Sequence, residues 1–570
     1  MDVRAPRAAR LLAALVLILL AAAAPAGAQQ PQPVAALDSR PAFHSLTGRE
    51  AIRIASRDAK VREERARGGR LTPFAYLSGS DRWQISFFRA GRERAQVLVD
   101  DARGSVVESW TGWQVPWKMA RGYSGQFGGK LNAPYVWLPL CLLFLLPFVD
   151  PRRPFRMVHL DLLALLDFGA SHFFFNRGEI SVSVPLVYPV LLYLLGRMLW
   201  VGLRGARTPD PSRRLVPRVP IAWLALALVL LVGFRVALNV TESTVIDVGY
   251  SGVAGAHRIV TGHGLYDRRF PQDDPRGDTY GPVGYLLYVP FERALGFSGH
   301  WDDLPAAHGA AIAFDLLTLL GLLVLGRRLR AGPEGTALGV ALAYAWATYP
   351  YALFALQSNS NDAAVAMLLV WALVALRSPA GRGALAAVAA AVKLAPVALA
   401  PLLAAGTERS RGRTLVFAAV FAAVVVAAFA PFVPHGGVRA IWDRTIGYQA
   451  GRDSPFSLWG QHHSLEWLHA TVTVAAAGLA LLVAFVPRRR SPARVAALGA
   501  AVLIAVQLAA AHWFYLYLAW FAPLVLVAVL APLRAVAVVP ERREEPDAQP
   551  VPVATTSPEG GRTAPEPAPA

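Results

Sequence analysis

Residues 221–280 read IAWLALALVLLVGFRVALNVTESTVIDVGYSGVAGAHRIVTGHGLYDRRFPQDDPRGDTY, an apolar run followed by a long polar segment. The run 221–240 has about the 20 residues that a helix needs to cross a bilayer. Asp247 lies just beyond it, and the polar segment 241–280 leads to the next apolar run. Ionisable groups at membrane depth are costly and usually functional. We therefore expect one long loop here, and we expect the chemistry of the chain within it.

Apolar runs of similar length recur through the 570 residues, of which 55% are hydrophobic and 16% charged. This composition predicts a polytopic α-helical membrane protein with about 11–13 membrane segments. Its net charge of +18 comes from arginines in short loops between the runs, which indicates topology and lipid contact rather than nucleic-acid binding. The single cysteine, Cys141, allows neither a disulfide framework nor a cysteine metal site.

The first residues have the layout of a cleavable secretory signal. Arg4, Arg7 and Arg10 precede the apolar run 11–24, and Ala26-Gly27-Ala28 supplies small residues for cleavage. We expect residues 1–28 to be removed. The alternative is an uncleaved first span, and the following segment is exported in either case.

Residues 30–133 contain no spanning run and predict a small exported α+β domain. Thr47 and Glu50 form a capping box before a helix that reaches Gly68. Alternating apolar residues then predict two or three strands between 83 and 110. The run WQISF…AQVLVDDARGSVVESW resembles the PepSY-like extracytoplasmic domain. That resemblance implies a binding or regulatory module and brings no catalytic motif.

Arginine-rich turns define the expected topology, because such turns stay in the cytoplasm. They lie at residues 150–156, 204–218, 409–413 and 488–490. Three transmembrane helices are expected within 134–218. The same rule places the segments 241–280 and 433–467 outside. The tail 540–570, rich in Pro, Glu and Thr, is expected to be disordered and cytoplasmic.

The segment 281–295 is short for a span and leaves two topologies open. If the arginines at 327–330 are internal, this segment is re-entrant or interfacial; otherwise those arginines lie outside and the next two loops invert. We favour the first topology, which places 357–362 outside, beside the Asp247 segment. Further on, Lys393 and Pro396 interrupt the apolar run 384–403. This break predicts discontinuous helices lining a cavity, where the charged amine needs a partner.

Five segments in a fixed order carry a family resemblance. They are DVGYSGVAGAHRIVTGHGLYD at 247–267, YGPVGYLLYVPFERAL at 280–295, FDLLTLLGLLVLGRRL at 314–329, LQSNSNDAAVAMLLVWAL at 356–373 and AAVKLAPVALAPLL at 390–403. With His512-Trp513-Phe514-Tyr515 they resemble the GT-C class of polyprenyl-phosphate-sugar-dependent glycosyltransferases, closest to the bacterial mannosyltransferase-like family (GT87-like). The resemblance implies a GT-C-like transmembrane core over 219–532.

Such enzymes transfer a sugar, most commonly mannose, from a polyprenyl phosphate to an acceptor hydroxyl at the outer face. By this resemblance Asp247 is the candidate catalytic base, which would take the hydroxyl proton. The family often has two adjacent acids here, whereas this chain has Val248. The base is then Asp247 alone, or the site draws on Asp267 or Asp278. The alternative for Asp247 is a solvated acid at a helix end.

The leaving lipid phosphate needs cations and donors close by. We expect Lys393 to serve, with Arg258, Arg444 or Arg452 reaching in from the outer loops; a snorkelling lysine and solvated arginines are the alternatives. Further candidates for donor phosphate or sugar binding are His512, Gln357, Asn359, Asp362 and Tyr280. His512 fits an aromatic interface belt equally well. The polar run 357–362 fits a helix cap at Asn361 equally well.

No metal and no cofactor is expected, since His462-His463 lacks an accompanying carboxylate pattern. The expected partners are membrane lipids, the polyprenyl-phosphate sugar and a lipid or glycan acceptor. The expected location is the inner or plasma membrane, with the N-terminal domain and the site outside. Two other classes stay open: a transporter or flippase, for which the sequence shows no internal repeat, and a non-catalytic envelope sensor.

Overall fold

The computed structural model describes residues 32–34, 36–79, 81–122, 128–204, 214–215, 219–267, 269–271, 274–301, 303–450, 454–532 and 534–535. Three sequence-based expectations fall outside these residues: the signal peptide 1–28, the role of Arg452 and the tail 540–570.

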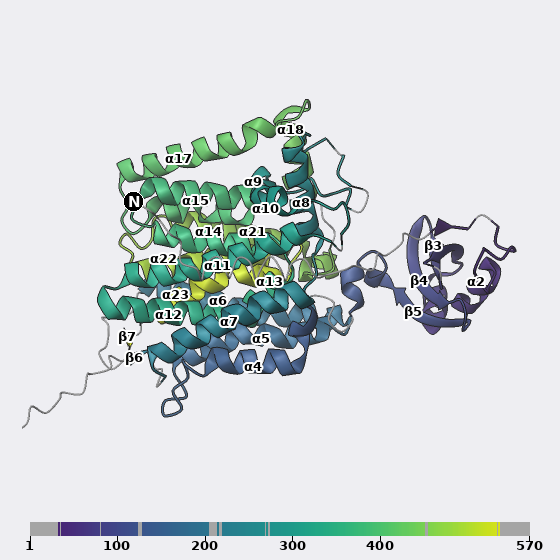
Figure 1. Cartoon of the computed structure of the whole chain (residues 1–570), viewed down its shortest axis with the longest axis horizontal. Coiled ribbons are helices and arrows are strands. Elements are labelled where there is room, and N and C mark those ends of the chain that lie inside the picture. Colours follow the sequence, from purple (N-terminus) through teal and green to yellow (C-terminus); the bar gives the residue numbers. More distant parts are fainter. Residues whose placement is uncertain are drawn as a thin grey trace, which may run out of the picture. The chain divides into compact units, whose positions relative to one another are not determined.

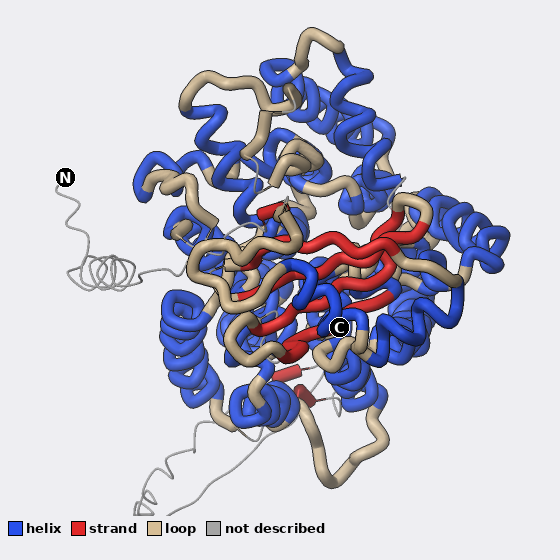
Figure 2. The backbone as a smooth tube through the Cα atoms, turned by 90° about the vertical axis from the view of Figure 1, so that its right-hand side faces the viewer, coloured by secondary structure: helices blue, strands red, loops and turns tan. Residues whose placement is uncertain are grey.

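The N-terminal region forms a small α+β unit. Its five-stranded antiparallel sheet has the order β1 (Gln32–Pro33), β2 (Thr72–Ser78), β3 (Arg82–Arg89), β4 (Arg92–Asp100) and β5 (Ser105–Thr111), drawn in red in Figure 2. One face of the sheet packs its alternating apolar residues, such as Trp83 and Val97, against Ala51 and Ala55. The sequence predicted two or three strands after the helix; four follow it.

The capping box at Thr47 and Glu50 is confirmed, because each side chain bonds to the other residue's backbone N–H. The predicted single helix is two helices, α2 (Gly48–Ser56) and α3 (Ala59–Gly68). Asp58 separates them, since its carboxylate accepts hydrogen bonds from the N–H groups of Lys60 and Val61 and so begins a second helix.

The rest of the chain is a helical bundle (Figure 1). Its long helices are α4 (Pro134–Leu145), α5 (Met157–Phe175), α6 (Ile180–Arg204), α7 (Ile221–Glu242), α11 (Pro305–Leu329), α12 (Gly332–Thr348), α13 (Pro350–Gln357), α14 (Asp362–Val374), α15 (Pro379–Val392), α17 (Arg411–Phe429), α21 (Glu466–Leu482), α22 (Pro492–Ala509) and α23 (Leu518–Leu530). Short helices include α16 (Ala400–Ala405) and the 3₁₀ turns η4 (Ala395–Leu399) and η8 (Tyr515–Tyr517). Two short strands, β6 (Arg214–Leu215) and β7 (Arg534–Ala535), pair in parallel.

This architecture is a polytopic α-helical membrane protein with a small sheet domain. Seven helices of the described chain are long and apolar enough to cross a membrane, and the pair α12–α13, bent by 61°, makes an eighth if it counts as one span. The larger number expected from the sequence is reached only if shorter apolar helices such as α4, α14 and α15 also lie in the membrane.

The prediction of one long loop over 241–280 is wrong, because residues Asp247–Val260 form a helix, α8. Small residues let this helix pack closely. A Cβ on Gly252 would lie 2.5 Å from the Tyr288 ring, and one on Gly255 would lie 2.2 Å from the Tyr285 ring. Both tyrosines belong to the segment 281–295, which forms the two short helices α9 (Pro282–Leu286) and α10 (Val289–Leu295).

Candidate functional site

Asp247 is the first residue of α8, and its side chain is exposed. Its Oδ1 accepts a hydrogen bond from the N–H of Val248 at 2.9 Å. A second acid lies beside it: the Ser251 hydroxyl contacts both the Asp247 carbonyl oxygen, at 2.8 Å, and Asp274 Oδ2. Burial raises the pKa of Asp274, and the charge of Asp247 raises it further, against the hydrogen bond from Ser251.

Through Ser251, Asp274 thus places a second carboxyl near the start of α8, where Asp247 is followed by Val248 and not by an adjacent acid. The only indication of this pairing in the sequence is an acid in the same polar segment. The two residues are 27 positions apart by their numbers, and only the folding of that segment over α8 brings them together.

The start of α8 is hydrogen-bonded to the break between α13 and α14. The N–H of Thr244 donates to the Gln357 carbonyl at 3.3 Å, and the N–H of Ile246 donates to the Ser358 carbonyl at 3.2 Å. Gly249 allows this approach, since a Cβ there would lie 2.3 Å from the Asn359 carbonyl oxygen. The base candidate and the polar run 357–362 thus form one local structure.

Asn359 holds that break in shape. It is a non-glycine residue with φ of 52°, in the left-handed region that asparagine tolerates better than most residues. Its amide accepts from Asn239 Nδ2 at 2.8 Å and donates to Ser243 Oγ at 2.8 Å and to the Thr244 carbonyl at 3.1 Å. All of these partners belong to α7 or to the chain just after it. The Asn359 side chain is therefore engaged by the fold itself.

Two neighbouring amides have polar atoms free. Gln357 is fully buried, and among the described residues neither polar atom of its side chain has a hydrogen-bond partner. Asn361 occupies the N-cap position of α14, but its side chain makes no capping bond, so the helix-cap interpretation of its side chain is not borne out; among the described residues its Oδ1 also lacks a partner. Buried amides without partners are costly unless water or a polar ligand satisfies them.

Lys393 ends α15 at the predicted helix break and has the partner that its charge requires. Its Nζ lies 2.6 Å from Asp362 Oδ1, with side chains that are 11% and 0% exposed. Trp520 donates its indole N–H to the same oxygen at 2.9 Å, and Ser360 donates to the other carboxylate oxygen at 2.9 Å. Both oxygens of the Asp362 carboxyl group therefore accept hydrogen bonds inside the bundle.

Aromatic rings surround the Lys393 ammonium. The ring centroids of Tyr280, Tyr517 and Trp520 lie 6.0, 5.7 and 5.4 Å from Nζ. The Tyr280 segment is close to the end of α15, since a Cβ on Gly281 would lie 2.0 Å from the Ala391 carbonyl oxygen. The helix breaks at 358–361 and 393–394 therefore meet at one polar position.

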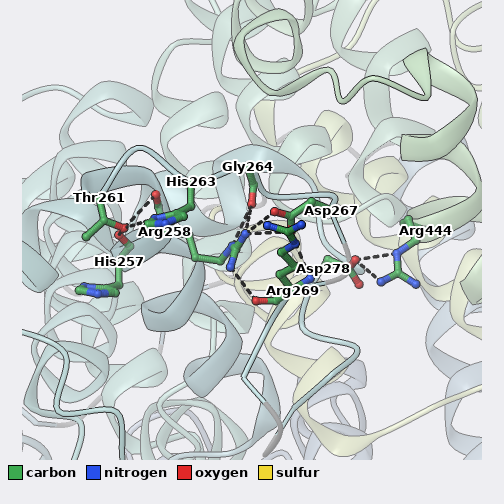
Figure 3. A network of polar contacts seen from close by, with 9 residues as sticks. All are labelled: His257, Arg258, Thr261, His263, Gly264, Asp267, Arg269, Asp278 and Arg444. Atoms are coloured by element: carbon green, nitrogen blue, oxygen red, sulfur yellow. Dashed lines mark hydrogen bonds and ion pairs between the residues drawn. The ribbon is translucent and has the colours of Figure 1, made fainter.

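Arg258 and Arg444 bind acids instead of lying free in solvent (Figure 3). Arg258 Nη2 contacts both Asp267 oxygens, at 2.8 and 2.7 Å, and its guanidinium also donates to the Gly264 and Arg269 carbonyls. Arg444 Nε donates to Asp278 Oδ2 at 2.6 Å. Burial raises the pKa of Asp278, and Arg444 partly offsets this. Because Asp267 and Asp278 each neutralise an arginine, and Asp247 is exposed at the start of α8, Asp247 is the better candidate for the base.

His512 lies among aromatic rings, as one of the two interpretations proposed. Its ring stacks on Trp117 with centroids 5.8 Å apart, and its Nδ1 is 2.8 Å from Ser454 Oγ. Within the part of the chain that the structure describes, no group of three or more His, Cys, Asp or Glu side chains is arranged to hold a metal ion.

Residues 279–511 match the family model described as Glycosyltransferase family 87. The matched region contains Tyr280, Gln357, Asn359, Asp362 and Lys393, and it stops just before His512. Asp247, Arg258 and the sheet domain lie outside it. No curated protein and no solved structure matches the chain. With the helical membrane fold, the family match supports a GT-C-like membrane glycosyltransferase.

Proposed function

We propose that this protein transfers a sugar, with mannose as the first candidate, from a polyprenyl-phosphate donor to a hydroxyl of a lipid or cell-envelope glycan at the extracytoplasmic face. The observation that carries the proposal is the buried Lys393–Asp362 pair. It lies where two helix breaks meet, and one of those breaks is hydrogen-bonded to the chain just before Asp247. Lys393, a cation for the donor phosphate, and Asp247, a carboxylate for the acceptor, thus belong to segments that are hydrogen-bonded to or packed at the same helix break.

Lys393 is suited to hold the donor phosphate. Among the described residues its ammonium has one hydrogen-bond acceptor, Asp362, so further N–H donors remain for a ligand. When the bond between the sugar and the phosphate breaks, negative charge grows on the phosphate oxygen. A positioned ammonium in a low-dielectric site stabilises that charge strongly. Asp362 and the three rings keep the ammonium in position before the donor arrives.

Asp247 is suited to activate the acceptor. Its carboxylate takes the proton of the acceptor hydroxyl while the hydroxyl oxygen bonds to the anomeric carbon. The bond from that carbon to the phosphate oxygen breaks, and the polyprenyl phosphate leaves with the electron pair. Attack on the face opposite the leaving group inverts the anomeric centre. Asp274 and Ser251 act on the reaction by positioning the start of α8.

The unpartnered amides suit the sugar. Asn361 directly precedes Asp362 of the Lys393–Asp362 pair and has an unpartnered side-chain oxygen among the described residues, and Gln357 adds a buried, unpartnered amide in the same polar run 357–362. Sugar hydroxyls both donate and accept, so they can satisfy amide groups that the fold leaves unbonded. Under this proposal the choice of sugar depends on these amides, and the sheet domain serves as a binding or regulatory module.

The proposed orientation places α8 and the segment 433–467 outside the cytoplasm of an inner or plasma membrane. Thr261 and Ser464 are exposed and test this, and Ser410 is a matched control in a loop expected to be internal. In a Cys141→Ser background, Thr261→Cys and Ser464→Cys should react with an impermeant thiol reagent in intact cells, and Ser410→Cys only after the membrane is opened. The reverse labelling pattern would show that the orientation in the membrane is opposite to the proposed one.

The reaction itself is tested with purified protein in liposomes that contain polyprenyl-phosphate mannose and an extract of envelope lipids as acceptors. Mass spectrometry should detect both free polyprenyl phosphate and a new mannosylated product. Parallel reactions with glucose and arabinose donors test the choice of sugar. Binding of every donor without release of polyprenyl phosphate would favour a flippase or a sensor instead.

A further inference from the structure

An acidic side chain is exposed in the middle of α5, a helix long and apolar enough to cross a membrane. Asp167 is exposed, and α5 (Met157–Phe175) is one of the candidate membrane spans. At about 1.5 Å of rise per residue, the carboxyl lies roughly 12–15 Å from each end of the helix. A charged residue at this depth is costly and normally pairs with another polar group.

Asp167 lies in a groove between α5 and α6. The groove has a volume of about 440 Å³ and is lined by Leu160, Leu163, Ala164, Leu166, Asp167, Pro189, Val190 and Tyr193. Leu160 and Leu163 are among the most exposed large apolar residues of α5. The groove is therefore an open apolar channel along the bundle surface, with one carboxyl within it. Ala164 and Pro189 are small or compact, which allows a close approach from outside.

The other acid in this part of α5 is already compensated. Asp161 Oδ1 accepts hydrogen bonds from Arg197 Nε and from the Tyr193 hydroxyl, each at 2.8 Å. Within the described part of the chain, the Asp167 side chain has no comparable hydrogen bond or ion pair with an arginine or a tyrosine. The fold thus satisfies one of two acids on the same helix and leaves the other facing the groove.

We infer that this groove is a docking site for a transmembrane helix of another membrane protein that carries a lysine or arginine near mid-span. The apolar lining fits a helix surface, and the carboxyl fits a cation that would otherwise be equally costly in lipid. A lipid acyl chain could fill the groove but offers no positive charge. This inference is independent of the proposed transferase reaction, and α5 and α6 lie outside the glycosyltransferase family match.

A second copy of this chain is a poorer partner. Two arginines lie well inside candidate spans of the described chain, Arg197 and Arg235. Arg197 is bonded to Asp161, and Arg235 is bonded to Asp315. A second copy would have to break one of these pairs to supply the cation, which removes the advantage of pairing Asp167.

The test uses the full-length protein in liposomes with a synthetic transmembrane peptide built of Leu and Ala. One peptide has a central Lys, and its control has a central Leu. Phe155, fully exposed just before α5, provides a labelling position as Phe155→Cys in a Cys141→Ser background. Energy transfer to a dye on the peptide reports association. The Lys peptide should bind about 3- to 20-fold more tightly than the Leu peptide, as expected for one interhelical polar contact.

Three variants decide the outcome. Asp167→Leu should abolish the preference for the Lys peptide, and Asp167→Lys should transfer the preference to a peptide with a central Asp. Adding Leu230→Asp to Asp167→Leu places the acid on α7 instead, where Leu230 is 66% exposed, and should not restore the preference. Equal binding of the two peptides to the parent, or a preference that survives Asp167→Leu or returns with Leu230→Asp, would overturn the inference. Mannose transfer is measured in the same liposomes and should be unchanged by Asp167→Leu, which separates this outcome from the proposed function.

Discussion

Two buried ion pairs lie within the helical bundle, and they are closed to different degrees. Arg235 binds Asp315 through two parallel bonds, Nη2 to Oδ1 at 2.6 Å and Nε to Oδ2 at 3.0 Å, with side chains 1% and 4% exposed. Its Nη1 donates to the Ala347 carbonyl, and Trp346 donates to Asp315. The Lys393–Asp362 pair also has a tryptophan donor, Trp520. Its cation, however, makes a single hydrogen bond within the described residues.

The two pairs differ in how much hydrogen-bonding capacity the cation keeps for a ligand. A guanidinium with bonds on all three nitrogens has little capacity left for a ligand, and its position within the unbroken helix α7 makes it a fixed link to α11. An ammonium at a helix break, bonded to one carboxylate and bordered by rings, can add a phosphate oxygen without losing that bond. Two pairs of similar charge and burial are therefore suited to different roles: the first links α7 to α11, and the second, under the proposed function, prepares a binding site.

The largest expected effect is on the closed pair. Arg235→Met leaves Asp315 buried without its cation, which costs about 3–5 kcal/mol for a buried pair. We expect a loss of folded protein, measured by size-exclusion chromatography after detergent extraction. Arg235→Met combined with Asp315→Asn removes both charges and keeps an oxygen for Trp346, so it should recover much of the yield. A folded single variant with normal yield would show that this pair does not stabilise the fold.

A large effect is also expected at the base beside the open pair. Asp247→Asn removes the basic oxygen and nearly preserves shape, so transfer should fall by about 10²–10⁴-fold, the usual contribution of general acid–base catalysis. Donor binding should survive, because Asp247 is exposed and lies outside the buried pair. Transfer is measured as release of polyprenyl phosphate.

Asp267→Asn is the matched control for Asp247→Asn, since Asp267 belongs to the same polar segment and is bonded to Arg258. It should reduce transfer much less. Activity of Asp247→Asn within about threefold of the parent, far below the range for a general base, would remove Asp247 from the mechanism. Attention would then move to Asp274, which the fold places beside it.

The open pair is tested by Lys393→Met, for which donor affinity should fall about 10- to 100-fold, in line with a hydrogen bond between charged groups. The single variant also leaves Asp362 without its cation, so it is compared with Lys393→Met plus Asp362→Asn. If Lys393 binds the donor, the double variant stays weak. If Lys393 only neutralises Asp362, the double variant regains donor binding, and the distinction between the two ion pairs fails.

The sequence predicted the long apolar helices well because each depends on its own composition; α7 (Ile221–Glu242) begins at the first residue of the predicted span 221–240 and ends two residues beyond it. It missed α8, because glycines and alanines form much of the buried face, so no apolar period marks the helix. The pairing of Lys393 with Asp362 could not be predicted from the sequence either. The charge predicted a partner, but its identity depends on how two helix breaks far apart in the chain meet.

The smallest effect is expected for an acid outside the membrane. Asp101 in the sheet domain accepts hydrogen bonds from the Trp83 indole at 2.8 Å, the Leu46 N–H at 3.0 Å and the Ser45 N–H. Burial acts to raise the pKa of Asp101, but these donors outweigh it and lower the pKa below the ordinary 3.8. Like Asp362 it has a tryptophan donor, but its other partners are neutral backbone groups.

A lowered folded-state pKa gives a stabilising contribution that is present above the unfolded-state pKa and is lost as pH falls through the folded-state value. Asp101→Asn should therefore weaken this domain at neutral pH by about 1–3 kcal/mol, the cost of leaving buried donors poorly satisfied. The difference from the parent should shrink as pH falls below about 4. Hydrogen–deuterium exchange of peptides around Ser45 and Leu46, in the full-length protein at matched pH, measures it. Asp81→Asn, an exposed neighbour, is the control and should exchange like the parent. A difference that stays constant down to pH values well below the ordinary pKa would mean that Asp101 stabilises the domain by shape alone, and not through its charge.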